Sequence, residues 1–368
     1  MRLPGMEFQP QHISLLAYNT GTVLKRMDLI PDMEHRYGLP YLSVQRAPLH
    51  QCLLKYAVAT GAIIKLDSHV QSIDIESGTV HLTGKVAIQA DIIIGADGEN
   101  SWCRSMLLGR SDPPLHFGHQ IFSCHIPISK IDEEDPELGP LRMDHGTSWW
   151  MGPGTMAIAT TTRGEHSYIN LMGGLIESET TEIRGRPIEL PKECVKGSFE
   201  HWHPTINKLV DISTSCQAWT STVTPPLREW THPCGRFTLL GDAAHAMTPY
   251  LAQGAAQCFE DAVVLGTILS RMAGHHSLPD VMRVYQSVRE PRCRQLKQVS
   301  LKLRDIYCAV DGDAQRNRDY ELQQCTPKPG FVIPWLDPVF QAWMYDYDGE
   351  KEAQLVCDRQ SQDVVVIQ

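Results

Sequence analysis

The 368-residue sequence contains no run of about 18 or more apolar residues, and no basic N-terminal segment is followed by an apolar one. We therefore expect neither a membrane-spanning helix nor a secretory signal. The formal net charge is -10, and Lys and Arg are scattered along the chain rather than gathered in one stretch. This distribution argues against a nucleic acid or an acidic membrane as a partner, because both bind clustered positive charge.

Cysteine pairing motifs are also absent. The eleven cysteines are an odd number and contain no C-x-x-C pair. Such usage is typical of a reducing compartment, so we expect a cytoplasmic protein with mostly buried thiols. It predicts neither a disulfide framework nor a zinc site, and we expect no other metal.

The length suits two domains of ordinary size, or one large α/β unit with an inserted sheet. Hydrophobic residues make up 42% of the chain and charged residues 21%, and no internal repeat is present. We expect a discontinuous α/β domain, a β-rich domain inserted into it, and a helical or irregular C-terminal tail. Their predicted ranges are 1–114 with 231–310 for the first, 115–230 for the second and 311–368 for the tail.

Short strands and one helix are expected in the first part of the chain. Residues 13–29 predict two strands about a turn. From Ala47, apolar residues recur at spacings of three and four, which predicts a helix ending at Gly61, and a strand is expected over residues 62–66. Short strands joined by glycine turns follow. The last of these, residues 91–95, is an isoleucine run typical of a parallel strand buried on both faces.

Residues 115–230 show a different pattern of apolar and polar residues. Alternating segments such as IFSCHIPI, TSWWMG and TMAIATTT predict a mostly antiparallel sheet. Residues 192–211 predict a helix that is split or bounded at Pro204. A buried strand and a helix then follow, and two further helices are expected over residues 278–307.

The first chemical signal is the stretch GDAAHAMTPYLAQGAAQ, residues 241–257. It follows a buried strand, and Gly241 permits a backbone conformation that other residues resist. Asp242 then stands at the carboxyl end of that strand, where a carboxylate can accept hydrogen bonds from a sugar hydroxyl. Beyond Pro249, a helix over residues 253–271 begins with small, uncharged residues. Its free N–H groups suit a phosphate or the polar edge of a ring.

Two other segments carry signals of the same kind. Residues 91–104 read DIIIGADGENSWCR, in which a buried strand leads into a GADG turn. Ser101 and Arg104 then fall on the first turn of a following helix. Arg46 stands at another helix start. Taken alone, each of the three segments also fits an ordinary turn, an ordinary helix start or a solvated surface charge.

Taken together and in this order, the segments resemble the class A FAD-dependent aromatic monooxygenases, the family of salicylate hydroxylase and 4-hydroxybenzoate hydroxylase. Arg46 and Leu49 match the family's R-x-x-L helix start. Residues 95–104 match its GADG-x-x-S-x-x-R segment, and residues 241–262 match its long GDAAH segment. The resemblance covers about residues 40–300. It implies an α/β fold with a Rossmann-like, three-layer FAD-binding domain similar to glutathione reductase and an inserted antiparallel substrate domain.

The resemblance also implies a cofactor and a reaction. In such enzymes NAD(P)H reduces the flavin, O2 forms a flavin C4a-hydroperoxide, and one oxygen atom passes to an electron-rich ring carbon. The expected substrate is a small aromatic or phenolic compound, of the type that fungal enzymes of secondary metabolism use. Asp242 would bind the ribityl or ribose side of the FAD, and Pro249 would lie against the isoalloxazine. The residues implied in FAD binding are Arg46, Asp97, Gly98, Asp242, Pro249, Gly254 and Ala255.

The inserted sheet would cover the substrate, so its arginine, histidine and tyrosine side chains are candidates for contacting it. Each such residue is more often structural than catalytic. His245 lies inside the GDAAH motif, where packing beside the flavin is the alternative to a chemical role. The candidates in the inserted domain for contacting a phenol or carboxylate are Arg163, His166, Tyr168, His125 and His145.

One element of the family is missing from the sequence. The family begins with a strand and a G-x-G-x-x-G fingerprint whose helix N-terminus holds the pyrophosphate, and no such fingerprint occurs here. By register with Arg46, about 60 to 80 residues, or one and a half βαβ units, are absent. Three functions stay open: a working monooxygenase or a fragment of one, a truncated paralogue that no longer binds FAD, and a flavin-dependent dehydrogenase.

Overall fold

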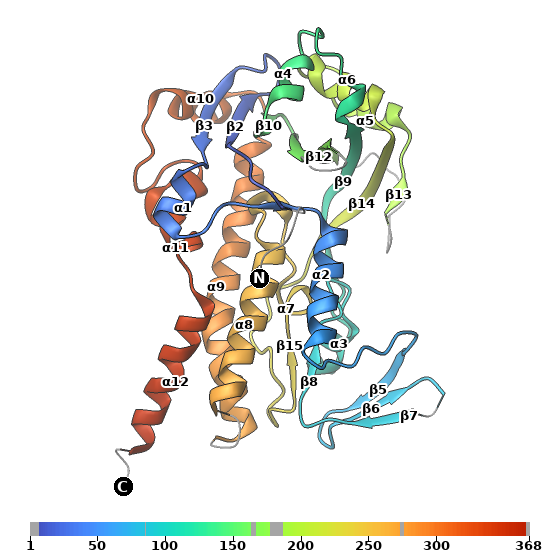
Figure 1. Cartoon of the computed structure of the whole chain (residues 1–368), viewed down its shortest axis with the longest axis vertical. Coiled ribbons are helices and arrows are strands. Elements are labelled where there is room, and N and C mark those ends of the chain that lie inside the picture. Colours follow the sequence, from blue (N-terminus) through green and yellow to red (C-terminus); the bar gives the residue numbers. More distant parts are fainter. Residues whose placement is uncertain (1–6, 85, 163–166, 177–186, 273–275, 366–368) are drawn as a thin grey trace. The chain divides into compact units, whose positions relative to one another are not determined.

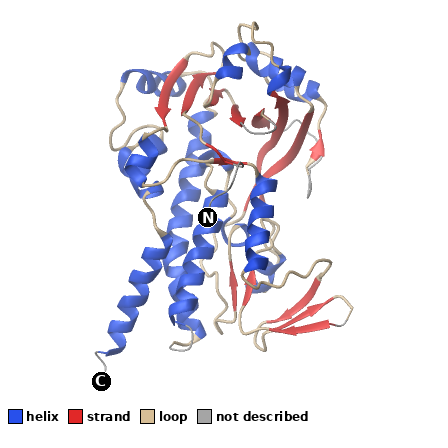
Figure 2. Ribbon diagram, in the orientation of Figure 1, coloured by secondary structure: helices blue, strands red, loops and turns tan. Residues whose placement is uncertain are grey.

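A computed structural model describes residues 7–84, 86–162, 167–176, 187–272 and 276–365. Its contacts divide the chain into two units, and their elements are drawn in Figure 1 and Figure 2. Unit 1 comprises residues 1–64, 118–221 and 304–346, and unit 2 comprises residues 65–117, 222–303 and 347–368. This division differs from the expected one, because it places the first 64 residues and much of the tail with the inserted sheet.

Unit 1 is built on a sheet that, among the described residues, has eight strands in the order β13-β14-β9-β12-β11-β10-β2-β3. The pair β2 and β10 is parallel, whereas β2–β3, β10–β11, β11–β12, β12–β9 and β13–β14 are antiparallel. The two predicted strands over residues 13–29 and the mostly antiparallel sheet are therefore confirmed. The strands are β2 (His12–Ala17), β3 (Val23–Asp28), β9 (Leu115–Pro127), β10 (Thr147–Gly152), β11 (Thr155–Thr162), β12 (Tyr168–Ile176), β13 (Ile188–Glu189) and β14 (Ser215–Val223).

Two helices in unit 1, α5 (Lys192–Ser198) and α6 (Pro204–Ile212), confirm the predicted split at Pro204. Proline is accepted there because the first residue of a helix has no N–H partner to lose. Both helices contribute to a buried cluster with β9 and β12. The other helices of this unit are α1 (Asp32–Tyr37), α2 (Arg46–Ala59), α4 (Gly139–Met143), α10 (Asp313–Gln324) and α11 (Pro338–Tyr345), and β1 (Glu7–Phe8) pairs with β4 (Ser43–Val44).

Helix α2 forms where the apolar spacing predicted it, but it buries none of its side chains. Tyr56 and Val58 expose 46% and 55% of their surface. The three-and-four spacing therefore predicted the conformation of the backbone correctly. It did not lead to burial of an apolar face among the described residues.

The described part of unit 2 contains two small sheets and three long helices. Strands β8 (Ile93–Gly95) and β15 (Phe237–Leu239) form a parallel pair. Strands β5 (Val70–Asp74), β6 (Thr79–Leu82) and β7 (Val86–Gln89) form an antiparallel sheet, and the predicted glycine turns contain Gly78 and Gly84. Both glycines have a positive φ. The helices are α3 (Trp102–Leu108), α7 (Asp242–His245), α8 (Gly254–Met272), α9 (Leu278–Tyr307) and α12 (Gly349–Val365).

The core of unit 2 forms between the parallel strands and the long helices. Phe237 and Leu239 of β15 are fully buried, as are Val264 and Ile268 of α8. Tyr285 of α9 is also fully buried and belongs to the same cluster. Helix α12 packs along α8. This core holds the carboxyl end of β15 and the start of α8 in one rigid frame.

Three local predictions are corrected. Residues 62–66 form no strand, and Ile63 is 83% exposed, because no described strand lies beside them to complete a hydrogen-bonded ladder. Strand β8 is parallel as predicted, but Ile94 is 43% exposed because β15 is the only described neighbour of β8. Residues 278–307 form one helix rather than two, since buried side chains on both sides of Pro291 hold α9 together.

The expectation for the cysteines is corrected as well. Cys124 of β9 and Cys216 of β14 form a disulfide with a Cα–Cα distance of 4.2 Å. Of the nine free cysteines, Cys293 and Cys357 are buried, and the others are at least partly accessible. The sequence did not show this pair because 92 residues separate two cysteines that neighbouring strands bring together.

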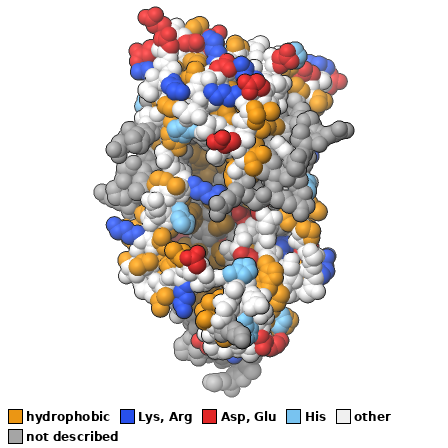
Figure 3. Space-filling view, turned by 90° about the vertical axis from the view of Figure 1, so that its right-hand side faces the viewer, with side chains coloured by type: hydrophobic (Ala, Val, Ile, Leu, Met, Phe, Trp, Pro, Cys, Tyr) orange, Lys and Arg blue, Asp and Glu red, His pale blue; other side chains and the backbone are white. Residues whose placement is uncertain are grey.

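Helices that combine the length and the hydropathy needed to cross a membrane do not occur in the described part of the chain. Among the coloured side chains of Figure 3, acidic, basic and hydrophobic residues are interspersed.

Candidate cofactor site

The site begins where β8 and β15 end. The two strands pair in parallel, with Leu239 opposite Gly95. One residue later, the Leu240 N–H donates to the Gly95 carbonyl at 3.0 Å. Because parallel strands share their carboxyl edge, the turn with Asp97 and the loop with Asp242 leave the sheet at the same edge. Ligands of open α/β sheets bind at such an edge.

Gly241 shapes the first turn of this loop. Its φ of +65° lies in a region that favours glycine, and a Cβ there would meet Cys258 Sγ at 2.9 Å. Its carbonyl accepts hydrogen bonds from the N–H groups of Ala244 and His245, at 2.8 and 3.0 Å, which closes the short helix α7. The predicted need for glycine at this position is confirmed.

Asp97 and Asp242 differ in how their carboxylates are used. Asp97 accepts hydrogen bonds from the Ser101 hydroxyl at 2.5 Å and from the Cys103 N–H at 3.0 Å, so it caps the start of α3 together with Ser101, the N-cap residue. Asp242 is exposed and makes no side-chain hydrogen bond or ion pair with the described residues. Of the two carboxylates, that of Asp242 has all its acceptor positions available for a ligand.

The chain then turns into α8. Pro249 is exposed and begins a short 3-10 turn, Pro249–Leu251, and Ala252 has a positive φ of 53°. Helix α8 starts at Gly254, where a Cβ would meet no atom within 4 Å, and Ala255 is exposed. The first turn of this 19-residue helix has no acidic residue. Its leading N–H groups and its positive dipole end are thus left for an anionic or polar ligand.

The buried carboxylate of Asp261 holds the loop after β15 in place. Asp261 of α8 accepts hydrogen bonds from the Gly241 N–H at 2.9 Å and from His245 Nε2 at 2.7 Å. Its other oxygen accepts from Arg289 Nε of α9 at 2.7 Å. Arg289 is fully buried and also donates to Glu260. The ion pair between Asp261 and Arg289 therefore joins α8 to α9, and the hydrogen bonds of Asp261 join both helices to the loop that carries Asp242.

The charges of this network are mutually stabilised. Burial alone would raise the pKa of the Asp261 carboxyl, but the hydrogen bond from His245 and the charge of Arg289 lower it. Burial alone would lower the pKa of His245, but its interactions with Cys293 and Asp261 raise it to about 10. His245 thus acts as a buried cation that binds Asp261 rather than as a proton acceptor near neutral pH.

Two further cations, Arg104 and Lys297, donate hydrogen bonds to backbone carbonyls in and near the loop. Arg104, which is 1% exposed, donates to the carbonyls of Ala244 and Pro225 and pairs with Asp112 at 2.7 Å. Lys297 of α9 donates to the Thr224 carbonyl. Burial and the nearby charge of Arg104 lower the pKa of Lys297 to about 8. Arg104 and Lys297 therefore position the backbone around the site.

Gly98 follows Asp97 in the turn after β8 and has a φ of +82°. The other remaining predicted residues lie in unit 1 or outside the described residues. Arg46 is exposed at the start of α2 and has no described side-chain partner. Tyr168 begins β12, and its ring centroid lies 4.1 Å from that of His125 on β9. His145 precedes β10, and its ring is 6.2 Å from that of Phe8. Arg163 and His166 lie outside the described residues.

Comparison with known proteins shows the family. A model of the FAD binding domain matches residues 184–300. The FAD-dependent monooxygenase atnJ from Arthrinium sp is 30% identical over 299 residues, which are 80% of this chain and 69% of that protein. The chain belongs to the FAD-dependent monooxygenases. It is thus an oxidoreductase with an FAD-binding domain, as the sequence predicted.

Another curated protein and a solved structure are also similar to this chain. The 3-amino-4-hydroxybenzoate 2-monooxygenase from Streptomyces cremeus is 28% identical over 342 residues, 90% of this chain and 77% of that protein. The solved structure of a salicylate hydroxylase substrate complex aligns with a TM-score of 0.74 at 19% identity. That alignment covers 96% of this chain and 84% of the other, and it confirms the mixed α/β fold.

Sequence reasoning missed several residues that build the candidate site. Asp261 lies within residues 241–262, which match the family's GDAAH segment, so a signal for it was present. Arg289 and Lys297 carry no local signal, because a charged residue in a long helix is usually solvated. They belong to the site only because α9 packs against α8 and the Thr224 turn.

Proposed function

We propose that this monooxygenase binds FAD at the shared edge of β8 and β15 and uses NAD(P)H and O2 to hydroxylate a small aromatic or phenolic substrate. The exposed, unpartnered carboxylate of Asp242 carries the proposal. It stands between a glycine turn held by Asp261 and the uncharged start of α8. Membership of the family supports FAD as the ligand of that edge.

The residues present suit the parts of FAD. Asp242 would accept a hydrogen bond from a ribityl or ribose hydroxyl, a role that needs a free carboxylate. The N–H groups at Gly254 and Ala255 would face the polar edge of the isoalloxazine or a phosphate, and Pro249 would lie against the ring. Open space at Gly254 leaves room for this approach.

Asp97, Gly98 and Arg46 would contribute in different ways. Asp97 retains acceptor capacity after it caps α3, since a carboxylate offers about four lone-pair sites. Gly98, with a φ of +82°, gives its turn a backbone that a side chain would strain. The exposed guanidinium of Arg46 would pair with a phosphate. We keep all three as binding residues of the proposal.

Bound FAD would supply the redox chemistry, in which NAD(P)H provides two electrons and one atom of O2 enters the substrate while the other leaves as water. The protein's task is then to hold, orient and shield. Asp261 and Arg289 fix the loop, and Arg104 fixes its backbone from the side of α3. His245 stabilises Asp261 and is assigned no proton transfer, because its pKa of about 10 keeps it protonated.

The aromatic pair on the sheet of unit 1 is proposed to contact the substrate. The Tyr168 and His125 rings lie 4.1 Å apart, and burial lowers the pKa of His125, so this histidine is neutral near pH 7. A neutral imidazole and a phenol can hydrogen-bond a hydroxyl of an aromatic substrate. The relative that acts on 3-amino-4-hydroxybenzoate supports this substrate class.

The visible spectrum of the purified full chain tests the proposal first. A yellow protein with about one FAD per chain is expected, and a colourless chain that takes up no added FAD would contradict the proposal. NAD(P)H consumption with a panel of phenols and aminobenzoates then identifies the substrate. Oxygen from labelled O2 in the product would establish hydroxylation, whereas oxidation without the label would indicate a flavin-dependent dehydrogenase.

A further inference from the structure

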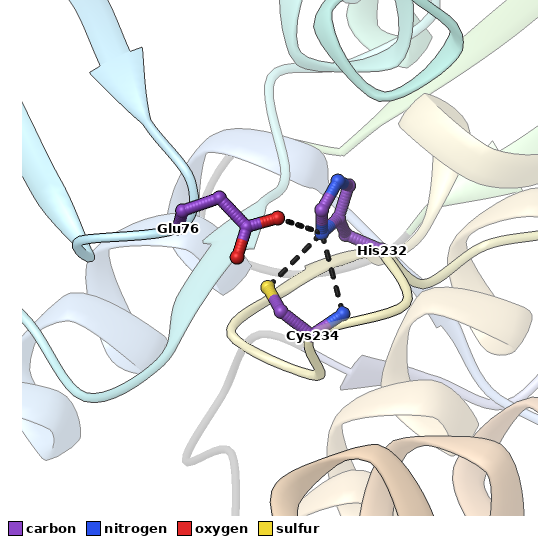
Figure 4. Close-up of side chains that lie close together, drawn as sticks. All are labelled: Glu76, His232 and Cys234. Atoms are coloured by element: carbon purple, nitrogen blue, oxygen red, sulfur yellow. Dashed lines mark hydrogen bonds and ion pairs between the residues drawn. The ribbon is translucent and has the colours of Figure 1, made fainter.

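A second group of chemically reactive side chains lies in unit 2, away from the GDAAH loop. Glu76, His232 and Cys234 each direct one ligand-type atom toward a common point, and these atoms lie within 4.8 Å of one another (Figure 4). His232 Nδ1 is 3.0 Å from Cys234 Sγ and 3.9 Å from Glu76 Oε1. None of the three residues belongs to the proposed cofactor site.

Two tight turns hold the cluster in place. In the first, the His232 N–H donates to the Phe237 carbonyl at 2.9 Å and the Gly235 N–H donates to the His232 carbonyl at 2.8 Å. Gly235 has a φ of +74°, and a Cβ there would lie 2.3 Å from Pro279 N. This turn puts the His232 and Cys234 side chains on one side. Only glycine can close it in this position.

Glu76 comes from the turn between β5 and β6. The Ser77 N–H donates to Asp74 Oδ1 at 3.2 Å, and Gly78 has a φ of +73°. A Cβ at Gly78 would lie 2.3 Å from the Ala90 carbonyl oxygen, so this turn also requires glycine. The backbone therefore brings Glu76 to the His232 turn.

His232 presents a lone pair to the cluster. The Cys234 backbone N–H lies 3.4 Å from Nδ1 and can only donate, so this nitrogen directs its lone pair toward the Cys234 turn, and a bound ion would replace that weak contact. All three groups meet at this one nitrogen. In a catalytic Cys–His relay, the thiol would contact one ring nitrogen and the carboxylate would bond the opposite one. Here the thiol and the carboxylate both lie near Nδ1, so the arrangement does not suit a Cys–His nucleophile.

A thiolate, an imidazole nitrogen and a carboxylate oxygen are the three ligand types of zinc in proteins. Zinc bond lengths of about 2.0 to 2.3 Å with tetrahedral angles put neighbouring ligand atoms roughly 3.3 to 3.8 Å apart. The observed separations of 3.0 and 3.9 Å lie close to that range. A divalent ion would also neutralise the two negative charges of a Cys thiolate and a Glu carboxylate.

The cluster is accessible to an ion from solvent. The Glu76 side chain is 76% exposed and that of His232 is 25% exposed. His232 also lines a hollow with a volume of about 640 Å3, together with Leu108 and Arg283. Three protein ligands at a solvent-accessible position leave the fourth ligand to water, as in open zinc sites.

The other comparable cluster, His245 with Asp261 and Cys293, is unsuited to a cation. Arg289 is fully buried and already occupies Asp261 at 2.7 Å. The other Asp261 oxygen is used by Gly241 and His245. A divalent ion there would lie beside a buried positive charge, which is strongly unfavourable.

We propose that Glu76, His232 and Cys234 form a binding site for one zinc-like divalent transition-metal ion, completed by water. The ion would join the β5–β6 turn to the turn that precedes β15. Binding would release the Cys234 thiol proton to solvent, because a metal-bound cysteine is a thiolate. The site is independent of FAD and stands whether or not the chain binds a flavin.

Metal binding to the full chain tests this site. The protein is reduced with a phosphine, stripped with a chelator and titrated with Zn2+ by calorimetry. We expect one ion per chain, and with Cd2+ a thiolate-to-metal charge-transfer band. Cys234→Ser and His232→Asn are expected to weaken binding about tenfold or more, the scale of losing a metal-site residue. Glu76→Gln is expected to act more weakly, because water can replace an exposed ligand.

Cys194→Ser is the matched control, because Cys194 is an exposed free cysteine in unit 1. It is expected to leave the stoichiometry, the affinity and the Cd2+ band unchanged. Far-UV circular dichroism confirms that each variant is folded. The proposal is overturned if the reduced chain binds no ion, if Cys234→Ser and His232→Asn bind as tightly as the wild type, or if Cys194→Ser removes the band.

Discussion

The Asp261 carboxylate on helix α8 lies 2.9 Å from the backbone nitrogen of Gly241, at the turn that presents Asp242. The same carboxylate binds His245 and Arg289, each at 2.7 Å, and is completely buried. A single side chain therefore connects the backbone of the candidate cofactor loop to helices α8 and α9. The position of Asp242 depends on this connection.

Asp261→Ala is expected to destabilise the protein by about 3 to 5 kcal/mol, because it leaves the Arg289 guanidinium buried without its partner. Asp261→Asn keeps the shape and an acceptor for Gly241 and is expected to cost less. Denaturant unfolding measures both values. Asp91→Ala, at an exposed carboxylate without side-chain partners, serves as the control and is expected to change stability by less than about 0.5 kcal/mol. Equal stability of Asp261→Ala and the wild type would contradict the role of this network.

Asp242→Ala tests the proposed flavin contact. Loss of a charged hydrogen bond is expected to weaken FAD retention by about 1.5 to 3 kcal/mol, roughly ten- to hundredfold in Kd. Stability without the cofactor is expected to stay the same, because Asp242 has no side-chain partner in the described chain. Equilibrium dialysis with FAD measures the affinity, and Asp91→Ala is again the control. An unchanged Kd would remove Asp242 from the site.

A pair of glycine substitutions separates folding from binding. Gly241→Ala forces a side chain into a φ of +65° and against Cys258 Sγ, so we expect a loss of about 1 to 3 kcal/mol in unfolding free energy. Gly254→Ala meets no atom within 4 Å and is expected to fold normally. It would nevertheless lower FAD affinity if the flavin lies against α8. Normal FAD binding by a folded Gly254→Ala would show that the cofactor does not approach this residue.

The pH dependence of stability tests the charge of His245. Its pKa is raised from 6.5 to about 10 in the folded protein, so its stabilising contribution is complete below pH 6.5 and is lost as the pH rises toward 10. The pKa of Lys297 is lowered from 10.5 to about 8, so its contribution to the unfolding free energy rises as the pH increases from 8 to 10.5. Between pH 6.5 and 8 we therefore expect unfolding free energy to fall in the wild type.

His245→Gln is expected to remove that decline, since glutamine can bind Asp261 but does not titrate. Chemical unfolding of both proteins at a series of pH values measures the difference between them. A difference that does not change with pH between 6.5 and 8 would show that His245 is neutral in the folded protein.

Local sequence patterns predicted most of the individual elements. The strands of residues 13–29, the split at Pro204 and the helix beginning at Gly254 all appear as expected, because turn residues, proline and apolar periodicity act on the nearby backbone. The strand expected over residues 62–66 does not form. Branched apolar residues favour an extended chain, but a strand also needs a neighbour to bond.

Some features of the candidate site could likewise be predicted from the sequence, and others could not. Residue types and their spacing predicted the glycine turn at Gly241, the carboxylate after it and the uncharged start of α8. That Asp97 helps to cap a helix while Asp242 stays free depends on the folded chain. So does the position of Arg289 and Lys297 beside the loop. Such contacts join residues far apart in the chain, and only the packing of α8 and α9 brings their charges within hydrogen-bond distance.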